Sequence, residues 1–328
     1  MVISAPALAK PAYSESLSLT VTTDRQALNG GVYNVGSTVT FLGNVSNGSA
    51  VPDALVLFEV DNPKQDPWII RTLTTGQTPP GPWLSVQLLS LTPCDSSGNP
   101  KYSFLPGQDA GFKVTLKNNG ASPNPVLVTI NLFFSDRRPF RLLTVVNTTL
   151  DPSQSWSAFT WPVNIPANSV RGQAMVYASV FNDYPKNGGL PYSPELSAAF
   201  NITSGTPSPP PQSSPLGTFN FTASISYIPS IPIWVGNYTA YAITKYGYSL
   251  ASDQTTFSVI LIGDMNSDGK IDITDIATIA KAFGTQPGDP RWNPAADLSG
   301  PIPLVPDGRV DISDIAIVAK EFGMIVTP

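Results

Sequence analysis

The C-terminal part of the chain repeats one arrangement of oxygen-bearing side chains, and this repeat constrains the fold more than any other feature. In the first copy, oxygen side chains alternate from Asp264 onward, Gly269 follows, and Asp275 closes the loop. Calcium needs six to eight oxygen ligands, a sharp turn, and a closing carboxylate that binds through both oxygens. We therefore predict a calcium site with the ligands Asp264, Asn266, Asp268, Lys270 through its backbone carbonyl, Asp272 through water, and Asp275.

The second copy follows the same order but is interrupted. Asp297, Ser299 and Gly300 begin it, residues 301–306 are inserted before the third ligand, and the loop resumes at Asp307. Downstream, VDISDIAIVAKEFG matches the IDITDIATIAKAFG of the first copy. We predict a second, less regular calcium site with the ligands Asp297, Ser299, Asp307, Arg309, Asp311 and Asp314.

Each loop leads into a short amphipathic helix that stops at a glycine, Gly284 or Gly323. The predicted apolar faces are Ile276, Ile279, Ala280 and Phe283 in the first helix, and Ile315, Val318, Ala319 and Phe322 in the second.

Two loop–helix units, no helix before the first loop, and a closing Asp instead of Glu resemble a dockerin domain over residues 262–324. The resemblance implies a calcium-dependent fold and docking onto a cohesin, which is an Ig-like sandwich. The residues that match the docking positions are Ile273-Thr274, Ile312-Ser313, Lys281 and Lys320. An Ile replaces the common Ser or Thr in each pair, so the resemblance leaves the class of partner open.

The composition excludes several classes of function. The net charge is −5 and only 12% of the residues are charged, so the chain offers no basic stripe for nucleic acid. The sequence contains no His, which removes His-based triads and His-ligated zinc. The single Cys94 cannot form a disulfide within the chain. Abundant Pro and Gly are typical of a turn-rich β protein.

Proline-rich segments divide the strand-like sequence into three blocks. The blocks 17–74 and 217–261 are each too small to bury a core, since even about 60 residues is marginal for a domain. Joined, they make one sandwich of ordinary size. The fold class that we predict is therefore mainly β: two Ig-like β-sandwiches, one inserted in the other, plus a small α-helical calcium domain.

The predicted boundaries follow from this partition. The outer sandwich comprises residues 12–76 plus 216–261, and the inserted sandwich comprises residues 84–204. The dockerin-like unit, 262–324, follows the last strand without a linker, so we expect it to pack rigidly on the outer sandwich. The segments LTVTTDRQ, GSTVTFLGNV and VPDALVLFEV resemble the macroglobulin-type Ig domain of archaeal secreted proteins, and FLPGQDAGFKVTLKNNG resembles a CARDB-like adhesion domain. Both resemblances imply a surface protein.

The N-terminal tail, residues 1–16, has two interpretations. MVISAPALA is either the stub of a signal peptide or an apolar segment that adds a strand to a neighbouring copy. We expect a secreted, cell-surface protein, because calcium loops suit calcium-rich surroundings, and no membrane span, because no long apolar run exists. Possible N-glycans lie at sequons whose number is close to chance for this composition, namely Asn44, Asn47, Asn147, Asn201, Asn220 and Asn237.

The sequence gives only weak signals for catalytic residues. Glu15, Glu59 and Glu195 have no visible carboxylate partner in the sequence, so a two-carboxylate glycosidase centre is not predicted. The tryptophans Trp156, Trp161 and Trp234 lie among strand residues, which favours core packing over a sugar-binding platform.

Our main hypothesis is a non-catalytic, structural surface protein that self-assembles, for example into a filament. The alternative is a cellulosome-type adaptor whose dockerin recruits it to a cohesin while the sandwiches bind carbohydrate. A weaker third hypothesis is an enzyme accessory chain.

Overall fold

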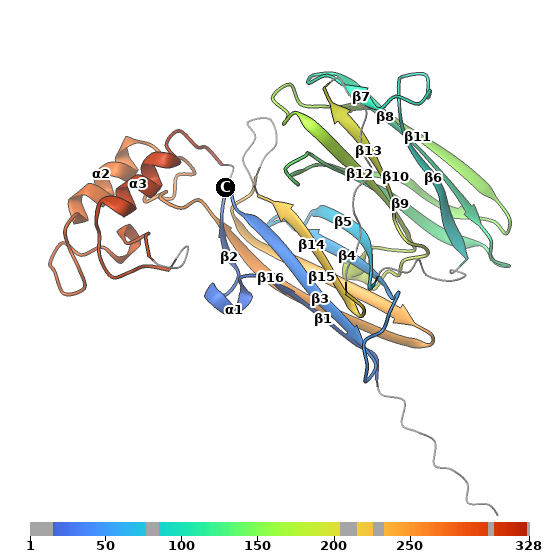
Figure 1. Ribbon diagram of the computed structural model, residues 1–328, viewed down its shortest axis with the longest axis horizontal. Coiled ribbons are helices and arrows are strands. Elements are labelled where there is room, and N and C mark those ends of the chain that lie inside the picture. Colours follow the sequence, from blue (N-terminus) through green and yellow to red (C-terminus); the bar gives the residue numbers. More distant parts are fainter. Residues whose placement is uncertain (1–15, 77–84, 204–214, 226–232, 301–304, 327–328) are drawn as a thin grey trace, which may run out of the picture.

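The computed structural model describes residues 16–76, 85–203, 215–225, 233–300 and 305–326. It is mainly β, with a small helical unit at the C-terminal end, as predicted (Figure 1). The predicted N-terminal donor strand lies outside the described residues. Among the described residues, no helix is both long enough and apolar enough to cross a membrane.

The first sandwich, called the outer sandwich here, combines strands from both ends of the β region. Its larger sheet has the order β2-β16-β15-β4-β5, and its smaller sheet has the order β1-β3-β14. The strands are β1 (Ser18–Thr23), β2 (Val32–Asn34), β3 (Thr38–Ser46), β4 (Leu55–Asp61), β5 (Pro67–Thr74), β14 (Thr218–Ser224), β15 (Gly236–Tyr246) and β16 (Ser249–Ile260). One helical turn, α1 (Gln26–Asn29), links β1 to β2.

The second sandwich, called the inserted sandwich here, uses the strands between β5 and β14. Its five-stranded sheet has the order β10-β9-β12-β13-β7, and its three-stranded sheet has the order β11-β8-β6. The elements are β6 (Val86–Cys94), β7 (Ser103–Phe104), β8 (Asp109–Asn118), β9 (Asn124–Phe133), β10 (Pro139–Leu150), β11 (Ser155–Asn164), β12 (Gly172–Phe181), the 3₁₀ turn η1 (Pro185–Asn187) and β13 (Leu196–Ile202). Each sandwich has its own apolar cluster.

The burial patterns of the strands show which sheet faces are covered. β1 alternates exposed and buried residues, because only the face with Leu19 and Val21 meets the opposite sheet. Every residue of β4 is buried. Its Val56 and Phe58 enter the outer core, whereas Leu57 belongs to a small apolar cluster shared with Leu127 and Phe181 of the inserted sandwich. The inserted sandwich therefore covers the second face of this sheet.

The two ends of the outer sandwich meet where the inserted sandwich leaves and returns. A Cβ atom built on Gly76 would lie 3.2 Å from the Leu216 side chain. Because these positions lie close together, a short peptide could join them without displacing the outer strands.

At the junction between the sandwiches, side chains of the inserted sandwich occupy the open edge of β5. The backbone N–H of Ile70 donates to Asn131 Oδ1 at 3.1 Å, and that of Thr72 donates to Glu195 Oε2 at 3.0 Å. The Arg71 guanidinium donates to both Glu195 oxygens, and its carbon lies 3.4 Å from the Tyr177 ring centre. An exposed sheet edge invites pairing with other chains, so these contacts satisfy and protect it.

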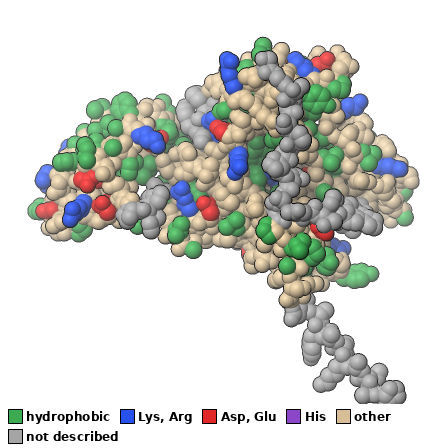
Figure 2. All heavy atoms as spheres, viewed as in Figure 1, with side chains coloured by type: hydrophobic (Ala, Val, Ile, Leu, Met, Phe, Trp, Pro, Cys, Tyr) green, Lys and Arg blue, Asp and Glu red, His purple; other side chains and the backbone are tan. Residues whose placement is uncertain are grey.

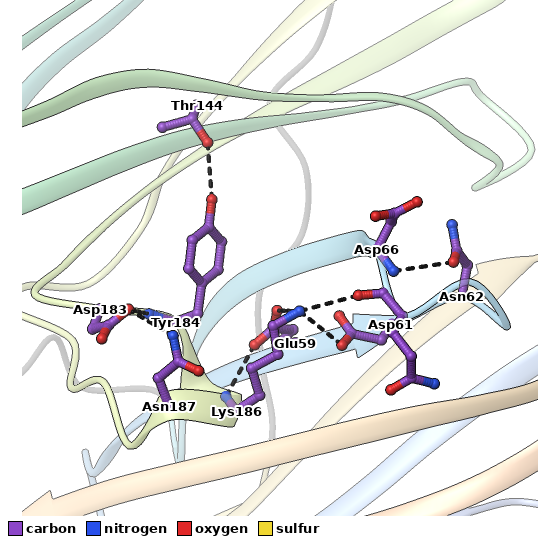
Figure 3. A network of polar contacts seen from close by, with 10 residues as sticks. Glu59, Asp61, Asn62, Asp66, Thr144, Asp183, Tyr184, Lys186 and Asn187 are labelled. Atoms are coloured by element: carbon purple, nitrogen blue, oxygen red, sulfur yellow. Dashed lines mark hydrogen bonds and ion pairs between the residues drawn. The ribbon is translucent and has the colours of Figure 1, made fainter.

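A second ionic contact at the junction joins Lys186 to two carboxylates of β4 (Figure 3). Lys186 Nζ lies 2.9 Å from Asp61 Oδ2 and 3.6 Å from Glu59 Oε1, and the Lys186 N–H donates to Glu59 Oε2 at 3.1 Å. Burial raises the pKa of Glu59 to about 7, and the neighbouring Asp61 adds to the rise, while contacts with Lys186 oppose it. The sequence argument saw no carboxylate partner for Glu59, but Asp61 lies beside it, and the cations that pair with Glu59 and Glu195 come from the other sandwich.

The helical unit contains α2 (Ile273–Ala282), the 3₁₀ turn η2 (Pro294–Ala296) and α3 (Ile312–Lys320). It lies against the end of the outer sandwich (Figure 1). Ile279 and Val318 belong to the same apolar cluster as the outer core, and the Ile262 N–H donates to Asn34 Oδ1 of β2 at 2.8 Å. A Cβ on Gly263, which has φ +93°, would lie 2.6 Å from Val318, so only glycine fits this close approach.

Candidate metal centre

The first loop wraps its backbone N–H groups around Asp264. Asp264 Oδ1 accepts from the Asp268 N–H at 3.1 Å, and Oδ2 accepts from the Gly269 N–H at 2.8 Å. Asn266 Oδ1 also accepts from the Asp268 N–H, and the loop turns through Ser267 and Gly269, both with positive φ. These contacts hold the predicted ligands Asp264, Asn266 and Asp268 close together within a tight turn.

The closing residue of the first loop is fully buried at the start of α2. Asp275 accepts from the Met265 N–H and from the Asp272 N–H, each at 2.8 Å. Asp272 is the N-cap of α2 and accepts from the Thr274 N–H, which completes a reciprocal capping box with Asp275. Hydrogen bonds from the Thr274 side chain and then its N–H lower the pKa of Asp272. The sequence shows the signal for this cap, two carboxylates three residues apart before an apolar run, but our sequence argument overlooked it.

The second loop repeats the contacts of the first despite its insertion. Asp297 Oδ1 and Oδ2 accept from the N–H groups of Asp307 and Gly308 at 3.3 and 2.8 Å. The buried Asp314 accepts from the N–H groups of Leu298, Ser299 and Asp311, and Asp311 caps α3. Burial raises the pKa of Asp297, the two N–H donors oppose the rise, and the carboxylates of Asp314 and Asp307 add to it. The remaining predicted residue, Arg309, is exposed.

The insertion closes on itself at its base. The Asp307 N–H donates to the Ser299 carbonyl at 2.9 Å, so the chain returns to the loop at the point where it left. A Cβ atom on Gly300 would lie 2.0 Å from the Val305 carbonyl oxygen. Glycine is therefore required where the two ends of the insertion meet.

The two loop–helix units exchange backbone hydrogen bonds. Ile271 in the first loop pairs with the chain after α3, through Met324 and Gly323, at 2.9 and 2.8 Å. Val310 in the second loop pairs in the same way with the chain after α2, through Gly284 and Thr285. Each loop is thus held by the segment that follows the other helix, and the sequence repeat by itself does not reveal this exchange.

The structure corrects the predicted helix faces. Ile279 and Val318 are buried as expected, but Ala280 and Ala319 are exposed, and Phe283 and Phe322 keep 45% and 54% of their surface accessible. The reason is that both helices end before the phenylalanines, at Ala282 and Lys320, so the chain has left the helical path where they occur.

The residues present fit calcium when the oxygen atoms other than carboxylates are included. Among the described residues, no three Asp, Glu, Cys or His side chains gather closely enough to hold a metal by themselves. Asn266 and the Lys270 carbonyl would have to complete the first site. In the second loop, the Ser299 hydroxyl is buried without a hydrogen-bond partner, at the position of the second predicted ligand. A cation would satisfy this oxygen and offset the buried charge of Asp275 and Asp314.

The positions expected to dock onto a partner lie on the surface. Ile273 and Ile312 are 66% and 67% exposed, and Lys281 and Lys320 are also exposed. In the view of Figure 2, acidic and basic side chains are interspersed over this unit.

The two helices differ in their surroundings. Lys320 and Ile317 of α3 line a cavity of about 280 Å³ between the second loop and the outer sandwich, and Arg25 and Asn34 line its other side. One of the docking positions of α3, Lys320, thus borders a cavity that the outer sandwich also lines.

Residues 262–323 match the family model for the dockerin type I domain. This match supports the resemblance drawn from the two loops, and it also supports calcium binding by this unit. None of the curated proteins that were compared matches the chain.

Similar solved structures are distant. An alkylpurine DNA glycosylase from Pseudomonas fluorescens is 14% identical with a TM-score of 0.29, covering 37% of this chain and 31% of its own. A Bacteroides uniformis β-glucuronidase is 6% identical with a TM-score of 0.29, and the match covers 49% of this chain and 26% of the glucuronidase. An α-2-macroglobulin from Escherichia coli is 12% identical with a TM-score of 0.24, and the match covers 77% of this chain and 24% of the macroglobulin. The chain thus spans about a third or less of each of these proteins.

Proposed function

We propose that this chain is a non-catalytic extracellular protein that docks onto a cohesin-type partner through residues 262–323, in a calcium-dependent manner. The observation that supports this proposal is the pair of loop–helix units, which combine loops suited to calcium with an exposed isoleucine at the start of each helix. Apolar side chains that remain exposed on a rigid helix are typical of a protein-binding surface.

We infer that the first unit makes the main contact with the partner. Thr274 and Lys281 are exposed on α2. The equivalent region of α3, with Lys320, borders the cavity against Arg25, where a partner would also meet the outer sandwich. Docking through α2 avoids that obstruction.

The sandwiches would act as a rigid arm for the docking unit. The neighbouring carboxylates Glu59 and Asp61 are fully buried beneath Lys186. They therefore form a structural contact between the sandwiches. The proposal accordingly includes no reaction.

Binding to immobilised type I cohesin domains, measured by biolayer interferometry with calcium and with excess chelator, tests the proposal. We expect binding only with calcium. Ile273→Asp should weaken it by about tenfold or more, because a charge would be buried at the contact, and Ile312→Asp should weaken it less. Leu28→Asp is the matched control, since Leu28 is 61% exposed on the outer sandwich. Binding that survives chelation, or equal losses for Leu28→Asp and Ile273→Asp, would reject the docking surface.

A second candidate is a structural subunit that assembles with copies of itself. The continuous core from the outer sandwich into the helical unit favours it, since this packing gives a rigid building block. Size-exclusion chromatography and electron microscopy of native material separate the two candidates. Polymers of this chain alone would favour assembly, and an equimolar complex with a cohesin would favour docking. Five of the six sequons are exposed and Asn201 is half-buried, so glycosylation stays a prediction that mass spectrometry of the same material can test.

A further inference from the structure

One face of the inserted sandwich remains without a partner sheet. In the three-stranded sheet β11-β8-β6, the side chains of Val114 and Leu116 are fully buried in the core. Because side chains alternate along a strand, Lys113, Thr115 and Lys117 of β8 lie on the opposite, outward face. The other sheet of this sandwich meets the outer sandwich, so the outward face points away from the rest of the molecule (Figure 1).

Two aromatic side chains lie on or beside this outward face. Phe159 is paired with Lys113 in the register of β11 and β8, and it is 45% exposed. A Cβ atom on Gly111 would lie 2.8 Å from the Phe159 ring, so the ring rests over a residue that has no side chain. Trp161, two residues further along β11, is 38% exposed and lies beside the face, where a bulge between Thr160 and Val163 interrupts the pairing with β8. The expectation that Trp161 and Trp156 pack in the core was therefore wrong, since both lie on an edge strand and Trp156 is 41% exposed.

The rest of the face combines hydroxyl groups with two cations, and Asp109 at the start of β8 adds a carboxylate that accepts from Asn164 Nδ2. Thr115 pairs with Ser157 and with Ser90, and the hydroxyls of Thr115 and Ser157 lie 3.0 Å apart. Neither Lys113 nor Lys117 has an ion-pair partner among the described residues. The two lysines are four residues apart on one strand, which separates them by roughly 13 Å.

We propose that this face binds an acidic polysaccharide, a polymer that bears uronic-acid carboxylates. Sugar rings present an apolar C–H face that can lie on Phe159 and Trp161, and hydroxyls that can bond Thr115 and Ser157. The two unpaired lysines select a ligand with carboxylates, since charge complementarity gives specificity. A face that extends across three strands suits an extended polymer better than a compact ligand. The site is separate from the docking unit and does not depend on it.

The test uses the full chain and a galacturonic-acid hexamer, with binding measured by titration calorimetry. Neutral dextran and oligo-deoxythymidine serve as competing probes. Lys113→Gln and Lys117→Gln should each weaken binding about threefold, as expected for exposed ion pairs, and added salt should weaken it further. Phe159→Ala should weaken it about tenfold. The matched controls are Lys245→Gln and Tyr248→Ala, which change exposed residues of the outer sandwich.

The result that supports the proposal is hexamer binding that the face variants reduce and the control variants do not. Phe159 also covers Gly111, so its replacement can lower stability. The lysine variants avoid this problem, because neither side chain is buried in the core, and their melting should match the parent. Absence of hexamer binding, equal losses for Lys245→Gln, or binding of the DNA or dextran probe in place of the hexamer would overturn the assignment.

Discussion

Replacing Arg71 tests whether the junction holds the two sandwiches together. Arg71 and Glu195 belong to different sandwiches, and each side chain is only 6% exposed. The Arg71 Nε atom lies 2.9 and 3.1 Å from the Glu195 oxygens, and the guanidinium also stacks on Tyr177. Arg71→Met keeps much of the apolar contact but leaves Glu195 with the Thr72 N–H as its remaining donor. Removal of one partner from a buried ion pair costs about 3–5 kcal/mol.

The size of the loss should depend on the charge that remains on the partner residue. In the double variant Arg71→Met/Glu195→Gln, no unpaired charge remains and the amide oxygen still accepts from Thr72, so stability should return to within about 2 kcal/mol of the parent.

Urea unfolding at constant calcium, followed by circular dichroism, measures these differences. Arg141→Met is the matched control, because Arg141 is exposed on β10, and its effect should stay within about 0.5 kcal/mol. A loss below about 1 kcal/mol for Arg71→Met, or a double variant as unstable as the single one, would refute the argument that this buried pair fixes the junction.

Three further predictions concern calcium, pH and the nested sandwich. Chelation should lower the melting temperature of the helical unit, and Asp264→Ala should reproduce much of the loss while Asp289→Ala should not; unchanged melting in chelator would contradict this. The pKa of Glu59 is about 7 in the folded chain against 4.5 ordinarily, so the folded state binds the extra proton. Stability should fall by about 2–3 kcal/mol as the pH rises from about 4.5 to about 7, and Glu59→Gln should remove this dependence in a pH series of urea titrations. Deleting residues 79–214 and joining the ends with a short Gly/Ser loop should leave a folded outer sandwich, because Gly76 and Leu216 lie close together; an unfolded product by circular dichroism would count against it.

The sequence by itself determined the features that depend on local patterns. Alternating apolar residues and abundant turn residues predicted a mainly β protein, and the spacing from Asp264 to Asp275 predicted a loop suited to calcium. These signals are local because a strand face repeats every two residues and a calcium loop takes its ligands from one short segment. The second loop keeps the main-chain contacts of the first despite the insertion before Asp307, because the two ends of the insertion meet at Ser299.

Only the tertiary structure decided which distant groups meet. The sequence did not show the cationic partners of Glu59 and Glu195, because Lys186 and Arg71 are more than a hundred residues away in the sequence and belong to the other sandwich. The exposure of Trp161 also could not be predicted from its strand, since an edge strand and a central strand have similar sequences and differ in what covers them. Burial depends on the packing of whole sheets, and for this reason the ionic junction and the aromatic face appear only when the chain is folded.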